Sequence, residues 1–241
     1  MAFYDSLKLE KGMYNKDFTS ALESIDPSEN YINTSLSGLD AYERQLKRFN
    51  IKVKGKNSDT IEAFFKTSDS AVLFPEYVKR SVLQGMNSAN VLPSIVATVT
   101  KIDGNDYRTI KTTIGTDSST TGISEGTELT STTITNQDEL VTLKKRGNVI
   151  SASYESLRLK RLDLFSVTLR QIGAQIARTQ LSDAVSVLVN GDGNNNAAVA
   201  VDPVSATGLA YADLIALWAS LDPYELNTIL ANTETMQVLL S

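Results

Sequence analysis

The chain has 241 residues, 41% of them hydrophobic and 21% charged, which is the composition of a globular protein with a substantial core. It contains no histidine and no cysteine, so histidine-dependent triads, thiol nucleophiles, disulfides and the usual zinc sites are excluded. No apolar run approaches the roughly 18 residues of a membrane span, and the N-terminal residues lack the apolar centre of a secretory signal.

The net charge of −5 is unevenly distributed along the chain. Residues 141–180 hold 8 basic and 2 acidic side chains, whereas residues 181–241 hold 7 acidic side chains and no basic ones. Such segments are either solvated faces or complementary patches that meet between subunits, and both interpretations stay open. The pI near 4.9 argues against sequence-specific DNA binding, which favours a basic domain.

The first third of the chain predicts short helices. Residues 1–35 are polar and weakly patterned, which predicts a mobile arm. Apolar residues at steps of three and four predict a helix over 37–49 with its charges on the opposite face. Residues 51–54 read as a short extended piece, and a second short helix is expected through Phe65. A third helix is expected over 74–86, because proline and glutamate favour its first turn.

Beyond Pro93 the pattern changes to one typical of strands. Residues 95–102 and 107–114 are rich in valine, isoleucine and threonine, with a turn between them. Of the 24 residues 112–135, 17 are Thr, Ser or Gly. This segment is either a linker or a projecting β-arm, and its ten threonines favour the β-arm.

The next part of the chain predicts a strand over 140–153, a short helix from Tyr154 and one long helix over 163–190. The long helix has only a narrow polar stripe, so most of its circumference is expected to be covered. Gly173 and Ala177 would let a neighbouring backbone approach closely. After the helix we expect a loop over 192–203, a helix over 211–221, a buried strand over 226–231 and a helix over 234–240.

Motifs that carry chemistry are weak. Residues 191–196, Gly-Asp-Gly-Asn-Asn-Asn, lack the context of a dinucleotide fingerprint and the sixth and twelfth residues of a calcium loop, so a helix C-cap is preferred. Lys144, Lys145 and Arg146 are either phosphate contacts or a solvated strand edge. The carboxylates Asp138 and Glu139 lie in a turn context. We therefore expect no catalytic residues, no cofactor and no metal, and we do not expect an enzyme.

The order of several motifs carries a resemblance to a known family. Leu73-Phe74-Pro75-Glu76-Tyr77 precedes a short helix, and Ile123-Ser124-Glu125-Gly126-Thr127-Glu128 precedes a strand. The segment 149–157 then leads into the long helix that ends at Asn190-Gly191-Asp192-Gly193. Residues 70–241 in this order resemble the major capsid protein of a tailed bacteriophage or prophage with the Hong Kong 97 capsid fold.

The resemblance implies an α+β fold with an N-terminal arm, an extended β-loop, a long spine helix and an incomplete axial domain. It implies these parts in order: 1–70, an N-terminal arm or scaffold-like helical region; 71–106, a short helix and first strand leading to the loop; 107–138, the extended loop; 139–200, peripheral-domain strands and the spine helix; 201–241, the start of the axial domain.

Two departures from the family limit what it implies here. Some relatives form a covalent cross-link from a lysine in the extended loop, but this chain has no lysine between Lys111 and Lys144, so we expect no such bond from the loop tip. Family members also continue through the axial domain and return to the peripheral domain. The apolar ending at 238–240 therefore leads us to expect further residues.

The resemblance implies a structural subunit that assembles with itself into hexamers and pentamers of an icosahedral shell. The shell would enclose double-stranded DNA without reading its sequence, would be built in the host cytoplasm together with portal and scaffolding proteins, and would not involve a membrane. An encapsulin-like nanocompartment shell and a Thr-rich tail-fibre or adhesin module are the alternatives. The residues expected at subunit contacts are Thr120, Thr121, Ile123, Glu125, Lys144, Lys145, Arg146 and Arg178.

Overall fold

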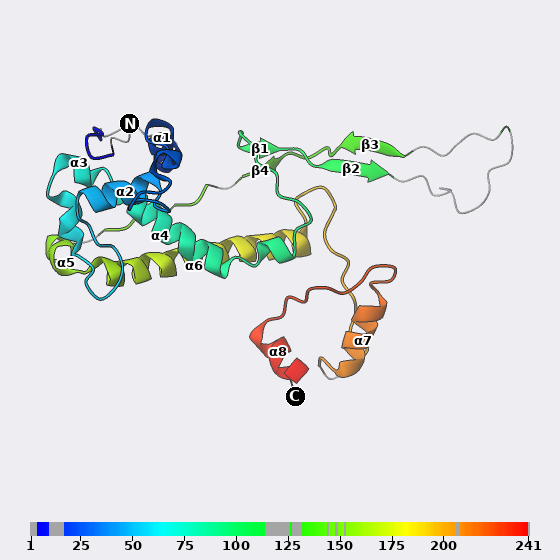
Figure 1. The fold of residues 1–241 in the computed structure, drawn as a ribbon. Coiled ribbons are helices and arrows are strands. Elements are labelled where there is room, and N and C mark those ends of the chain that lie inside the picture. The colour runs from blue at the N-terminus through cyan, green and yellow to red at the C-terminus, as the bar shows by residue number, and fades with distance from the viewer. Residues whose placement is uncertain are drawn as a thin grey trace. The chain divides into compact units, whose positions relative to one another are not determined.

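The fold was analysed in a computed structural model, whose chain divides into two compact units (Figure 1). Unit 1 comprises residues 1–90 and 147–180, and unit 2 comprises residues 91–146 and 181–241. Helices and short strands are both present, which is compatible with an α+β class. The structure describes residues 4–9, 17–113, 126, 132–143, 145–147, 149–151, 153–205 and 208–240.

Unit 1 is helical. Its elements are α1 (Phe18–Ile25), η1 (Ser28–Tyr31), α2 (Ala41–Arg48), η2 (Ile61–Phe65), α3 (Ser68–Ala71), α4 (Phe74–Ala89), α5 (Tyr154–Leu159) and the greater part of α6 (Leu162–Asn190). The helices expected at 37–49, 74–86 and 163–190 are confirmed with small shifts of their ends. Asp40 sets the start of α2, because its carboxylate accepts the N–H of Glu43 at 2.7 Å while Glu43 accepts the N–H of Asp40.

The N-terminal segment packs into this unit. Leu7 and Leu9 are buried, and α1 buries Phe18 and Leu22 in the same hydrophobic core as Tyr42. The expectation of a mobile arm over 1–35 is therefore wrong for the described part of that segment. Its apolar residues are too widely spaced to form a periodic pattern, but a core collects them from several elements.

Helix α2 also differs from expectation, because its charges are not confined to the solvent face. Arg44 is completely buried and lies 4.3 Å over the ring of Tyr31. Its Nε donates to Oδ2 of Asp26 at 3.0 Å, and its Nη2 donates to the carbonyl of the same residue. Its Nη1 donates to Ser28 Oγ at 2.9 Å and to the Leu39 carbonyl at 2.8 Å. This fully bonded pair joins α1 to α2.

Aromatic rings join the two halves of unit 1 that are distant in sequence. Phe74 stacks on Phe165 of α6 with 6.2 Å between centroids, and it meets Phe64 edge-on at 5.5 Å. The hydroxyl of Tyr77 donates to the carbonyl of Leu162 at 2.6 Å. Burial, which is the main cause, raises the pKa of Tyr77 to about 12, so the hydroxyl stays a donor.

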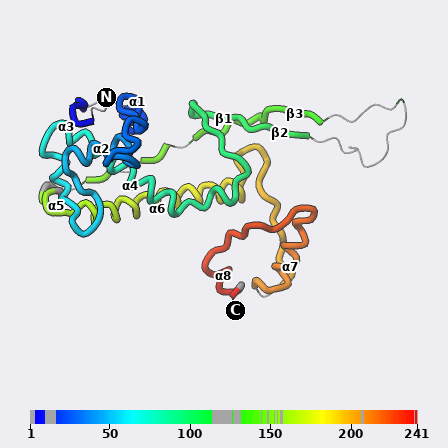
Figure 2. Tube along the Cα trace, viewed as in Figure 1, coloured from blue at the N-terminus to red at the C-terminus, as the bar shows by residue number. Residues whose placement is uncertain are grey.

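Helices α4 and α6 lie against each other at two glycines (Figures 1 and 2). A Cβ atom on Gly173 would stand 2.1 Å from the carbonyl oxygen of Val82, and one on Gly85 would stand 2.1 Å from the carbonyl oxygen of Arg170. Ala177 is buried one turn further along α6. The expected close approach is confirmed at Gly173, with α4 as the neighbour, whereas for Ala177 the structure shows burial.

Unit 2 contains η3 (Leu92–Ser94), β1 (Asp106–Tyr107), β2 (Ile110–Thr113), β3 (Thr133–Asn136), β4 (Val141–Thr142), the end of α6, α7 (Tyr211–Ala219) and α8 (Thr233–Leu240). Strands β1 and β4 pair antiparallel, as do β2 and β3. Within the described residues the two pairs continue each other as one narrow ribbon, because the N–H of Gln137 donates to the Thr109 carbonyl at 2.9 Å.

Three expected strands in this region are wrong or much shorter. Residues 95–102 and 226–231 have no strand pairing, and of the described residues within 140–153 only Val141–Thr142 are paired. Their β-branched composition favours extended backbone, but a strand also needs a partner of matching register. Within the described chain those partners are absent, so the extended preference stays unpaired.

Candidate assembly interface

The described residues of unit 2 bury no large apolar side chain. Every buried apolar residue of the described chain, from Leu7 to Ala177, belongs to unit 1, and Asp213 alone is buried in the described part of unit 2. A unit of this size ordinarily collects its apolar side chains into a core of its own. Unit 2 instead presents them to the outside.

Helix α7 shows this exposure of apolar side chains most clearly. Tyr211, Ile215 and Trp218 are spaced four and three residues apart, so they share one face of the helix, and they are 77%, 49% and 62% exposed. The segment after it and α8 expose further large apolar side chains: Tyr224, Leu226, Ile229, Leu230, Met236, Val238 and Leu240. An exposed apolar surface rich in aromatic and long aliphatic side chains is typical of a protein–protein contact.

The single charged residue of α7, Asp213, is buried. The carboxylate of Asp213 accepts the backbone N–H groups of Val204 at 2.6 Å, Ser205 at 3.0 Å and Ala210 at 2.7 Å. The bond from Ala210, followed by that from Ser205, lowers the pKa of Asp213 below its ordinary value. One side chain thus holds the loop before α7 to the first turn of the helix.

The Asp213 contact predicts a pH dependence. Because the folded pKa is lowered, the stabilisation is complete at neutral pH and is lost as the pH falls below about 3.8 towards the folded pKa. Asp213→Asn is expected to speed hydrogen exchange at the amides of Ser205 and Ala210 several-fold at neutral pH. The control Asp202→Asn, an exposed residue in the same segment, is expected to leave these rates unchanged. Equal protection in wild type and Asp213→Asn would contradict the assignment.

The ribbon has two different faces, both exposed. The register pairs Thr112 with Ile134 and Ile110 with Asn136, so Ile110 and Ile134 lie on one face and are 65% and 66% exposed. Lys111 and three threonines occupy the other face. The described strands β2 and β3 flank a segment that lies largely outside the described residues, so the extended loop over 107–138 and the projecting β-arm stay predictions.

The ribbon is attached to the end of α6. The N–H of Glu139 donates to Asn194 Oδ1 at 2.9 Å, and Arg146 Nη2 lies 2.6 Å from Asp183 Oδ1. The C-cap expected at Gly191 is confirmed: its φ is +77°, and its N–H donates to the Val187 carbonyl at 2.8 Å. The Asn194 contact was not foreseen, since a helix-capping sequence gives no sign of which loop it will meet.

The predicted contact residues have different outcomes. Thr120, Thr121, Ile123, Glu125 and Lys144 lie outside the described residues. Lys145 and Arg146 are exposed, and Arg146 pairs with Asp183 of its own chain rather than standing free. Arg178 is exposed in unit 1, on the polar stripe of α6 that it forms with Thr168, Gln171, Gln175 and Ser182. A role of these residues between subunits stays a prediction.

The apolar residues of α7 and α8 were not among the predicted contacts. The sequence of α7 reads as an ordinary amphipathic helix, and only the structure shows that Asp213 is buried while Tyr211, Ile215 and Trp218 are exposed. Among the residues that the structure describes, no cluster of three or more acidic side chains is placed to hold a metal ion. In the same part of the chain, no helix is both long and apolar enough to cross a membrane.

Comparison with known proteins gives one family. Residues 136–241 match the model of a family described as phage capsid protein. Searches of curated proteins and of solved structures found no match. The matched segment runs from the end of β3 through α6, α7 and α8, and therefore contains the exposed apolar surface. The match supports a structural role in a phage capsid.

Proposed function

We propose that this chain is the major capsid protein of a tailed bacteriophage or prophage, with the Hong Kong 97 capsid fold. Its copies assemble into an icosahedral shell around double-stranded DNA. The observation that carries the proposal is the described part of unit 2, which buries no large apolar side chain and exposes the face Tyr211, Ile215 and Trp218. The family match over 136–241 and the resemblance in motif order both support it.

Each part of the subunit then has a geometric role. The extended loop 107–138 lies across a neighbouring copy, and Ile110 and Ile134 at its base give it an apolar face for that contact. Helix α6, held to α4 by two glycine contacts, is the rigid spine. The apolar surface from Tyr211 onward meets other copies at the capsomer centre. Portal and scaffolding proteins are further partners in the assembly, which takes place in the host cytoplasm.

Charge assists the same contacts. Residues 181–241 carry no basic side chain, and their acidic residues Asp202, Asp222, Glu225 and Glu234 are exposed. Residues 141–180 carry the excess of basic charge, with Lys145 and Arg178 exposed. Segments of opposite sign on different copies attract each other and disfavour wrong pairings, which adds specificity to the apolar contact.

Electron microscopy of the expressed full-length protein tests the proposal. Closed shells, or rings of five and six copies, are the expected result. Shells that purify with an enzyme inside rather than with DNA would favour a nanocompartment. A protein that stays monomeric at all concentrations and salt conditions would overturn the proposal.

Trp218 supplies an optical measure of the same event. It is the single tryptophan of the chain and is 62% exposed in the subunit. On assembly its emission is expected to shift to shorter wavelength and its quenching by acrylamide to fall several-fold, because a second copy removes water from the indole. Trp218→Ser is expected to raise the concentration needed for assembly at least tenfold. The control Val149→Ser, 89% exposed in unit 1, is expected to have little effect. Equal effects would contradict the assignment of the α7 face.

A further inference from the structure

A loop of unit 1 carries three exposed lysines in an alternating arrangement. Ile51 is buried and Val53 is half-buried, whereas Lys52, Lys54 and Lys56 are exposed. Alternate side chains of an extended segment lie on the same side, so Ile51 and Val53 anchor the segment while Lys52 and Lys54 share its solvent side. Lys56 is exposed in the turn that follows Gly55.

The loop has a defined conformation. The N–H of Lys52 donates to Asp59 Oδ2 at 2.7 Å, and the N–H of Asp59 donates back to the Lys52 carbonyl at 2.8 Å. At the tip, the N–H of Ser58 donates to the Gly55 carbonyl at 3.0 Å. Gly55 has φ +87° with open space around it, as an exposed turn requires.

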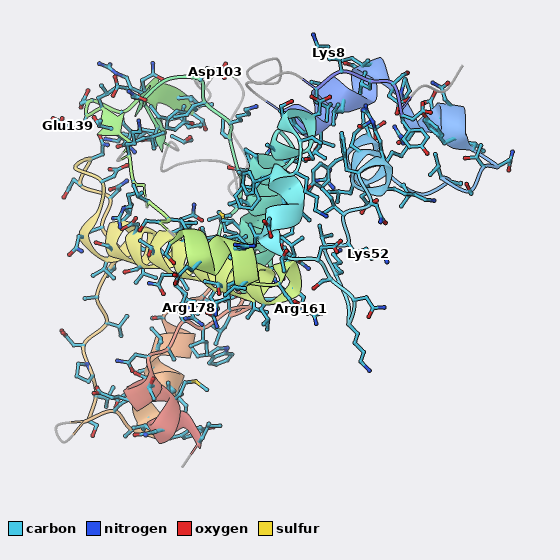
Figure 3. All side chains as sticks on the ribbon, turned by 90° about the vertical axis from the view of Figure 1, so that its left-hand side faces the viewer. Lys8, Lys52, Asp103, Glu139, Arg161 and Arg178 are labelled. Carbon is cyan, nitrogen blue, oxygen red and sulfur yellow. The ribbon has the colours of Figure 1, made fainter. Side chains whose placement is uncertain are left out.

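Arg161 holds this loop to the start of α6. Its Nη2 donates to the carbonyl of Lys56 at 2.7 Å and to that of Gly55 at 3.2 Å, and it lies 3.2 Å from Asp163 Oδ2. Figure 3 shows Lys52 and Arg161 at the same corner of the unit. The guanidinium of Arg161 is thus occupied within the subunit, and its function is to position the lysine loop.

A fourth lysine joins the loop through the backbone. Thr60 forms an antiparallel bridge with Arg161, and the N–H of Ile61 donates to the Lys160 carbonyl at 3.0 Å. This pairing places Lys160 beside the base of the loop, and its side chain is exposed. We call Lys52, Lys54, Lys56 and Lys160 the lysine corner.

The lysine corner is not neutralised within the described part of the chain. None of its four ammonium groups forms an ion pair there. Two carboxylates of the same segments have other partners: Asp59 accepts the N–H of Lys52, and Asp163 contacts Arg161 and the N–H of Leu164. The hydrogen bond with Ser58, the largest cause, lowers the pKa of Asp163, so this carboxylate is already satisfied. The surplus positive charge is available to an external anion.

The chemistry of the corner favours a phosphate backbone over a protein partner. Lysine is depleted in protein–protein interfaces, whose centres are apolar and aromatic. The segment 51–59 exposes no large apolar side chain. Ammonium groups on flexible stems suit contacts with phosphates that carry no sequence information. An exposed leucine, Leu159, adjoins Lys160 and would be the natural anchor if the partner were a protein.

We infer that the lysine corner contacts the phosphates of the double-stranded DNA that the shell encloses, so that this corner of the subunit faces the interior. The inference rests on the proposed function. It reconciles an acidic chain with a DNA cargo: one small basic site on each copy gives weak attraction that many copies repeat, while the rest of the subunit repels the duplex.

The test measures binding of the unassembled subunit to a labelled DNA duplex of arbitrary sequence, about 30 base pairs long, by fluorescence anisotropy between about 50 and 200 mM salt. The variant Lys52→Gln/Lys54→Gln/Lys56→Gln is expected to weaken binding at least tenfold at the lowest salt. It should also reduce the slope of log affinity against log salt by about 3. The matched control Lys101→Gln/Arg108→Gln/Lys111→Gln removes the same charge from exposed positions of unit 2.

The outcomes separate this inference from the proposed function. Equal weakening by both triple variants, or no binding by the wild type at low salt, would overturn the inference. A loss of DNA binding caused by Leu159→Ser, which removes no charge, would also overturn it, because the contact would then not depend on the lysines. Shell formation by each variant is scored separately by electron microscopy. Normal shells with unchanged DNA binding leave the proposed function intact, whereas absence of shells in the wild type refutes the proposed function itself.

Discussion

Replacing Arg44 by methionine is expected to lower the free energy of unfolding of unit 1 by about 3–5 kcal/mol. The guanidinium and the Asp26 carboxylate are both fully buried, and their side chains meet at 3.0 Å. Without Arg44, the carboxylate keeps only the hydroxyl of Tyr31, which donates to Asp26 Oδ1 at 2.7 Å. The free-energy cost of leaving a buried charge without its partner is far larger than the net stabilisation that the pair provides. Urea unfolding followed by far-ultraviolet circular dichroism measures the change.

Two further variants make this result decisive. Lys47→Met removes an exposed charge from the same helix and is expected to change stability by less than about 0.5 kcal/mol. If Arg44→Met does not fold, the double variant Asp26→Leu/Arg44→Met should restore a folded protein, because it removes both charges together. An unfolding midpoint of Arg44→Met equal to that of Lys47→Met would show that the pair does not join α1 to α2.

Replacing Gly173 by alanine is expected to destabilise unit 1 by about 3 kcal/mol, although alanine is the better helix former by about 1 kcal/mol. The added Cβ would meet the Val82 carbonyl oxygen at 2.1 Å and the Met86 nitrogen at 2.8 Å. Both are backbone atoms, so the clash is relieved only by moving helix α4 away from α6. Chemical unfolding and hydrogen exchange across α4 measure the effect.

Gly147→Ala is the matched control for this change. Gly147 also belongs to unit 1 and has nothing within 4 Å of the position of an added Cβ, so its effect should lie within about 0.5 kcal/mol of zero. Gly85→Ala should be destabilising in the same way as Gly173→Ala. The double variant should cost less than the sum of the two, because one separation of the helices relieves both clashes. If the two losses of unfolding free energy simply add, the structure relaxes independently at the two sites.

The parts of the fold that the sequence predicted well are those in which local pattern and packing agree. The long helix was expected over 163–190 and is α6 (Leu162–Asn190), because apolar residues cover most of its circumference and a glycine ends it. The close approach at Gly173 was also predicted. The identity of the neighbour was not, since a small residue shows where a backbone can approach but not which one does.

The predictions that the structure contradicts share a physical cause: each of these features depends on contacts with residues that are distant in the chain. The described part of 1–35 packs because Leu22 belongs to the same hydrophobic core as Tyr42 and Leu73, which a local pattern does not reveal. Arg44 was placed on a solvated face because periodicity treats every charge as exposed. The expected strand over 95–102 has the composition of a strand but lacks a partner within the described chain. The apolar face of α7 was missed for the converse reason: amphipathicity indicates two faces, but not which one is covered.

The β2–β3 ribbon exposes every residue of both strands, and a two-stranded ribbon standing alone is at best marginally stable in water. Under the proposed function, a neighbouring copy stabilises the ribbon that it receives. When the first few subunits meet, ordering the ribbon costs conformational entropy while few contacts form. Each later subunit forms contacts on several sides at once. Assembly of this kind has a threshold concentration, below which subunits stay free and above which closed shells form with few partial ones.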